Sequence, residues 1–113
     1  MKISTLISDV VSSQQFNAVN YPRLARIPPH QHQEFALRQL GILLQIAGGK
    51  LAEVVEPMQS GTSLDKAKLR LATREFLVHT FRLVDAAGMT PAEAVEEINS
   101  WIADNRKNKR EQI

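Results

Sequence analysis

The chain has 113 residues, 43% of them hydrophobic and 23% charged, which fits one globular domain and excludes a disordered or fibrous chain. It contains no cysteine, so a disulfide scaffold, a thiol nucleophile and a cysteine-ligated zinc site are excluded. The net charge is +2, and the excess of bases lies toward the two ends, because residues 51–105 hold more acids than bases.

No apolar run approaches the ~20 residues that a transmembrane helix needs. The N-terminal segment carries an acid, Asp9, inside its apolar stretch and does not have the layout of a signal peptide. We therefore expect a soluble, cytoplasmic protein without membrane contact.

Four segments have apolar residues at helical spacing, and none has a convincing strand pattern. The first helix is predicted from about Ile3 to Gln15. Residues 16–29 follow as a long connection with room for one short helical turn, because their prolines disfavour helix in the residues before them.

The second helix is predicted from about His30 to Val55, ending near Pro57. Its apolar residues cover more than one face, which indicates burial on more than one side. Gly48 and Gly49 each lower its helix propensity by ~1 kcal/mol relative to alanine. They predict a kink or the close approach of a neighbouring helix.

The third helix is predicted to follow Gly61-Thr62-Ser63, which supplies a turn and an N-cap, and to end at Gly88. The fourth opens with Thr90-Pro91-Ala92-Glu93, a capping box with proline at the first helical position. It is predicted to fray within Asn105–Arg110. Short connections make these helices antiparallel neighbours, so the sequence predicts an all-α bundle of about four helices.

This bundle is predicted to form one domain that spans residues 1–113 and ends in a frayed basic tail, residues 106–113. The tail offers candidate phosphate contacts at Arg106, Lys107, Lys109 and Arg110. Such a run is more typical of a solvated helix end whose charges complement the helix dipole, so nucleic-acid binding is not expected.

Histidines and carboxylates are the remaining side chains that could carry chemistry. His79 lies one turn after Glu75, a spacing that can ligate a metal, but no further ligand is positioned by the sequence. We therefore expect His30, His32 and His79 to be exposed or at the edge of the core. A second set, the i, i+3 pair Glu53 and Glu56 together with acids of the third helix, could hold a hard cation.

The segment from Arg74 to Ile98, continuing to Asn105, resembles the second half of a MazG-type domain. That half has a helix ending in a leucine-rich phrase, then an acidic start, then a helix with a closing Lys/Asn/Arg phrase. Upstream, Gly49-Lys50-Leu51-Ala52-Glu53 is similar to the "GELAE" phrase of the family. The resemblance covers roughly residues 34–108.

The resemblance implies an all-α nucleoside triphosphate pyrophosphatase fold, usually oligomeric, whose active members hold Mg²⁺ with a Glu-x-x-Glu and a Glu-x-x-Asp on successive helices. In this chain the first pair falls on Ala47 and Lys50, and the second on Ala72 and Glu75. Only Glu75 keeps a carboxylate. In the closing phrase Asn105 matches, whereas the expected lysine falls near Trp101.

These departures lead to the hypothesis that Lys50 replaces the missing cation and pairs with Glu75 across the second and third helices, neutralising a buried carboxylate. A rival is a shifted metal site built from Glu53, Glu56 and Glu75, which would need the Gly48-Gly49 kink to rotate the second helix.

Three functions follow. The first is a non-catalytic MazG-like protein that acts by oligomerisation and by binding a protein or a nucleotide, with no cofactor expected. The second is a divergent pyrophosphohydrolase that uses Mg²⁺. The third is a small helical adaptor that binds nucleic acid through its basic tail. A dimer or tetramer is expected because Phe35, Phe81 and Trp101 lie on faces that one small bundle does not fully cover.

Overall fold

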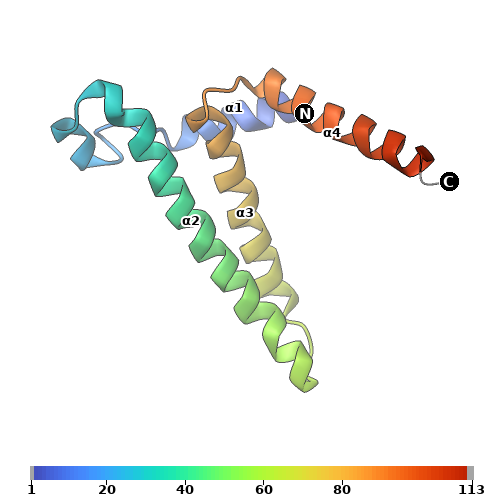
Figure 1. Cartoon of the computed structure of the whole chain (residues 1–113). Coiled ribbons are helices and arrows are strands. Elements are labelled where there is room, and N and C mark those ends of the chain that lie inside the picture. Colours follow the sequence, from blue (N-terminus) through green and yellow to red (C-terminus); the bar gives the residue numbers. More distant parts are fainter. Residues whose placement is uncertain (1, 112–113) are drawn as a thin grey trace.

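The structure is a computed structural model that describes residues 2–111, with side chains up to Lys109. In this part of the chain it has four α-helices, three short 3-10 helices and no strand, which confirms the all-α class (Figure 1). The elements are α1 (Ile3–Ser13), η1 (Pro22–Arg26), η2 (Pro29–Gln31), α2 (His32–Val55), η3 (Glu56–Ser60), α3 (Lys66–Ala86) and α4 (Pro91–Glu111).

Helices α2 and α3 form a long antiparallel hairpin (Figure 1). The chain turns at Gly61, whose φ of 83° lies in the left-handed region that glycine adopts at little cost. Asp65 is the N-cap of α3 and accepts a hydrogen bond from the Lys68 backbone N–H at 3.1 Å. The expected cap in Gly61-Thr62-Ser63 is therefore wrong by a few residues, because a carboxylate further along makes the capping bond.

Helix α2 is continuous through Gly48 and Gly49 and runs without a sharp bend (Figure 1), so the kink predicted there is not observed. Only Gly48 approaches a neighbour, since a Cβ at that position would lie 3.8 Å from the Phe76 ring, an ordinary contact distance. A Cβ at Gly41 or Gly49 would meet nothing within 4 Å. Packing against α3 keeps α2 straight in spite of its glycines.

The end of α3 and the start of α4 follow the sequence signals. Gly88 has a φ of 79° and follows the last turn of α3. Thr90 and Glu93 form the expected capping box, in which each side chain accepts a hydrogen bond from the other residue's backbone N–H, at 3.1 and 3.0 Å. The capping bonds also lower the pKa of the Glu93 carboxyl.

Helix α4 does not lie alongside α3 as the bundle prediction required. It packs mainly on α1, which also contacts α3, and it leads away from the hairpin (Figure 1). The radius of gyration is 17.7 Å, against about 13 Å for a compact domain of this length. Within one chain the four helices therefore form an open arrangement, since the turn after α3 directs α4 onto α1.

The described part of α4 is helical through Asn105–Arg110 and ends at Glu111. The Arg106, Lys107 and Lys109 side chains are exposed on this end, while the Arg110 side chain and residues 112–113 lie outside the described part. No helix within residues 2–111 is long and apolar enough to cross a membrane.

The core is small and lies where α2, α3 and the segment after α1 meet. Leu40 is completely buried, and Ala36 and Ala86 pack with it. Partly buried Phe16, Leu43 and Leu83 surround this cluster. The alanines bring α2 and α3 close together, while the larger side chains close the gap around Leu40.

Candidate functional site

The ion pair predicted between α2 and α3 is present. Lys50 Nζ lies 3.1 Å from Glu75 Oε1 and 3.3 Å from Glu75 Oε2. The carboxylate is not buried, however, because 34% of the Glu75 side chain and 53% of the Lys50 side chain are exposed. The pair thus joins the two helices at a partly wet surface, where screening keeps its contribution small.

The other two positions of the implied metal motif lie in the packed interior. Ala47 is 1% exposed and Ala72 is 4% exposed, on the two helices of the hairpin. Ala47 is two turns beyond the core residue Leu40, which places both on the side of α2 that meets α3. These positions supply packing contacts and no ligand for a cation.

A cavity of about 360 Å³ lies beside the ion pair, between α2 and α3. Its lining has two bases, two acids and three apolar side chains, which are Lys50, Lys68, Glu53, Glu75, Val54, Leu71 and Ala72. The charges balance, so the lining has no formal net attraction for either a cation or an anion.

The rival metal site is not assembled. Within residues 2–111, no group of three or more His, Cys, Asp or Glu side chains lies close enough to hold a metal ion. Glu53 lines the cavity with Glu75, but Glu56 stands exposed at the start of η3. The straight course of α2 explains why these three carboxylates do not converge.

A buried arginine lies further along α3, and the sequence analysis did not identify it. Arg82 is 2% exposed, and its guanidinium carbon is 4.5 Å from the centre of the Phe16 ring. It donates a hydrogen bond to the Tyr21 hydroxyl, and Tyr21 stacks on Phe16 with ring centres 5.0 Å apart. The Arg82 Nε atom has no hydrogen-bond partner. The two rings thus replace water around the cation, which fixes the segment after α1 against α3.

One signal could have revealed this position. Glu75, His79 and Arg82 are spaced i, i+4 and i+7, so they share one face of α3 with the core residue Ala86. A polar residue on the buried face of a helix indicates a specific partner. The aromatic residues that surround Arg82 come from the connection 14–21, where the sequence has no periodic pattern to place them.

His79 lies on the same face, between the ion pair and Arg82. Its Nδ1 atom is buried without a hydrogen-bond partner. Burial lowers the pKa of His79 below its ordinary value of 6.5, Arg82 and Lys50 lower it further, and Glu75 opposes them. The folded chain therefore favours the neutral imidazole.

This shift predicts a loss of stability in mild acid. Below about pH 6.5 the unfolded chain takes up a proton on His79 more readily than the folded chain, so the free energy of unfolding should decrease as the pH falls through the folded pKa. Urea unfolding between pH 7.5 and 5 would measure this. His79→Gln should flatten the pH dependence and the exposed control His30→Gln should leave it unchanged, whereas equal slopes in both variants would contradict the assignment.

The other two histidines play no part in this face. His30 is exposed in η2. His32 Nε2 lies 2.8 Å from the Ile27 carbonyl oxygen and 3.1 Å from that of Leu24, so this nitrogen must carry the hydrogen that both oxygens share. His32 thereby ties the 3-10 segment to the start of α2, which is a structural role.

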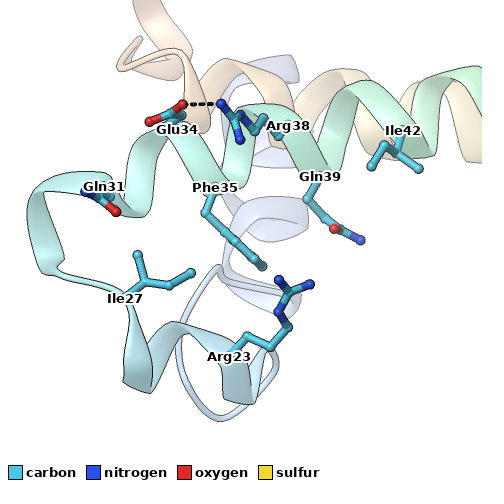
Figure 2. Close-up of a pocket in the computed structure, with 8 residues that line it drawn as sticks. All are labelled: Arg23, Ile27, Gln31, Glu34, Phe35, Arg38, Gln39 and Ile42. Carbon is cyan, nitrogen blue, oxygen red and sulfur yellow. Dashed lines mark ion pairs between the residues drawn. The ribbon is translucent and has the colours of Figure 1, made fainter.

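A second cavity, of about 280 Å³, opens between η1 and α2 (Figure 2). Arg23 and Phe35 point into the same space, and Arg38 at its rim pairs with Glu34 at 2.6 Å (Figure 2). None of the motif positions lines this cavity. Arg23 and Arg38 are exposed to solvent. The cavity therefore lacks the buried positive charge that is typical of an anion-binding site.

The remaining motif position lies on α4, away from the ion pair. The Asn105 side chain donates to the Trp101 carbonyl oxygen at 3.0 Å, a bond within the helix, and the Trp101 side chain is 65% exposed. The structure thus brings together Lys50 and Glu75 and leaves Asn105 with a local structural contact.

No protein-family model matches the chain, and neither a curated protein nor a solved structure was found to match it.

Proposed function

We propose that this chain is a non-catalytic, MazG-like helical protein that acts by self-association and by binding a protein or a nucleotide. The Lys50–Glu75 ion pair carries the proposal. A lysine ammonium 3.1 Å from the only carboxylate of the implied motif occupies the position where a magnesium ion would have to bind. A magnesium ion would have to displace Lys50 and would then have only one carboxylate of the implied motif, that of Glu75, as a ligand.

Two further observations support this function. Ala47 and Ala72 are buried, so the positions of the missing carboxylates have become part of the packing between α2 and α3. The charge balance in the adjoining cavity gives no electrostatic reason for a divalent cation to collect there. Hydrolysis of a triphosphate by this family's chemistry needs several hard oxygen ligands, which this arrangement lacks.

Manganese binding, followed by electron paramagnetic resonance, tests the proposal on the whole chain. The wild-type protein should leave Mn²⁺ free in solution and should release no pyrophosphate from a panel of nucleoside triphosphates in Mg²⁺. Lys50→Glu should gain Mn²⁺ binding, because it places a carboxylate beside Glu75 and removes the competing ammonium.

Lys50→Gln is the matched control, since it removes the positive charge without adding a ligand, and it should gain little affinity. Pyrophosphate release by the wild-type chain that Glu75→Gln abolishes would contradict the proposal. Mn²⁺ binding by the wild-type chain that Glu75→Gln abolishes would contradict it too, and either result would favour a pyrophosphohydrolase.

A further inference from the structure

Three positively charged side chains follow one another along the first half of α3. Lys66, Arg70 and Arg74 are four residues apart, which places each side chain one turn beyond the last on one side of the helix. All three are exposed, and no acid of the described part of the chain lies within ion-pair distance of them. We call these three residues the basic row.

The basic row faces away from the rest of the hairpin. Ala72 is buried on the side of α3 that packs on α2. Arg70 and Arg74 are each two residues from Ala72, which is about 200° around an α-helix. Helices α1 and α4 lie at the other end of α3, so this outer side of the helix stays open (Figure 1).

This placement of charge opposes the stability of α3. Bases at i and i+4 repel each other, and the basic row holds two such pairs in succession. Lys66 and Lys68 also bring positive charge into the first turn, where the helix dipole favours acids and the cap Asp65 is the only one described. By contrast, Arg38 and Lys50 each pair with an acid. A negatively charged partner would relieve the repulsion that the chain itself leaves in place.

An open groove of about 560 Å³ lies along the basic row. The described residues that line it are three bases and two apolar residues, namely Lys66, Arg70, Arg74, Ala67 and Leu71. Leu71 is 50% exposed. A partner that fits this groove must therefore present negative charge next to apolar groups.

We infer that the basic row and Leu71 dock an acidic amphipathic helix of another protein. Carboxylates one turn apart on such a helix match bases one turn apart on α3, and its apolar edge would cover Leu71 and Ala67. A nucleic-acid backbone would satisfy the bases but would leave Leu71 against phosphate and water. None of the described lining residues is aromatic, so the groove offers no ring on which a base could stack.

The inference rests on the proposed function in one respect, namely that the chain acts by binding a protein. It goes beyond that function because it assigns the partner's chemistry and the surface that receives it. The Lys50–Glu75 pair takes no part in this contact, so the two proposals depend on different side chains.

Fluorescence anisotropy of a labelled synthetic peptide tests the inference on the whole chain. The peptide is an amphipathic helix with glutamates one turn apart along one edge and leucines beside them. The wild-type chain should bind it, and more weakly as the salt concentration rises. The same peptide with lysine in place of glutamate should not bind.

Arg70→Glu should weaken binding of the acidic peptide about tenfold or more, because it replaces attraction by repulsion in the middle of the basic row. Arg106→Glu is the matched control, since it makes the same change of charge at an exposed position on α4, and it should alter the affinity by less than about twofold. Leu71→Gln should also weaken peptide binding, because it removes the apolar part of the contact.

Thermal unfolding checks the electrostatic premise independently of any ligand. Arg70→Glu should raise the melting temperature, because it converts two repulsive pairs into attractive ones. Arg106→Glu should not raise it, since a base near the end of α4 interacts favourably with the helix dipole. A lower melting temperature for Arg70→Glu would contradict the premise.

Three binding results would overturn the inference. They are absence of peptide binding by the wild-type chain, equal binding by Arg70→Glu and Arg106→Glu, and tighter binding of a labelled DNA duplex that Arg70→Glu abolishes. Peptide binding by a wild-type chain that also binds Mn²⁺ through Glu75 would instead contradict the proposed function and leave the basic row standing. A chain that binds neither would have the reverse meaning.

Discussion

Replacing Leu40 by alanine is expected to lower the free energy of unfolding by about 3 kcal/mol. Leu40 has no exposed surface and is the largest member of the cluster that also contains Ala36 and Ala86. Alanines cannot move inward to fill the space, so the substitution would leave a cavity between α2 and α3. Since small domains are stable by only about 5–15 kcal/mol, the loss is a large fraction of the total.

Urea unfolding at a fixed protein concentration, followed by circular dichroism, would measure the change. Leu37→Ala is the matched control on the same helix, because Leu37 is 39% exposed, and its effect should be less than half as large. Equal effects at the two positions would show that the cluster around Leu40 is not the centre of the fold.

Removing the hydroxyl of Tyr21 is expected to cost about 2 kcal/mol of stability, although the change deletes a single atom. Tyr21→Phe leaves the Arg82 guanidinium buried without the acceptor it now has, and its Nε atom already lacks a partner. The loss should therefore exceed that of an ordinary surface hydrogen bond. The aromatic rings of Phe16 and Phe35 would remain in place around position 21.

A double-mutant cycle separates this electrostatic cost from simple packing. Arg82→Met removes the buried charge and keeps a long apolar side chain, so Tyr21→Phe should cost much less in that background. The expected coupling is about 1.5 kcal/mol in urea unfolding. Strictly additive effects would mean that Tyr21 contributes by packing alone and that Arg82 does not depend on its hydroxyl.

The sequence predicted most of the helices because their signals are local. The capping box at Thr90, the turn glycines and the apolar periodicity each act within one or two turns, and they placed α1, α2 and α4 within a few residues. The path of α4 could not be predicted in this way. It depends on contacts with α1, far away in the chain, and no short-range pattern specifies them.

The candidate site likewise has one feature that the sequence predicted and one that it did not. The Lys50–Glu75 contact was predictable because two matching motif positions on neighbouring helices had opposite charges. The environment of Arg82 was not, because its aromatic partners come from an irregular connection. The expected burial of Glu75 was wrong because the hairpin of a single chain is too narrow to cover it.

The contact between α1 and α4 has a consequence for the order of assembly. It joins the first helix to the last and so closes almost the entire chain into a loop, whereas α2 and α3 meet through a short turn. Closing the longer loop costs more conformational entropy, so the hairpin can form early and independently. The two chain ends then dock together in a later step, and release of α1 deprives α4 of its main support.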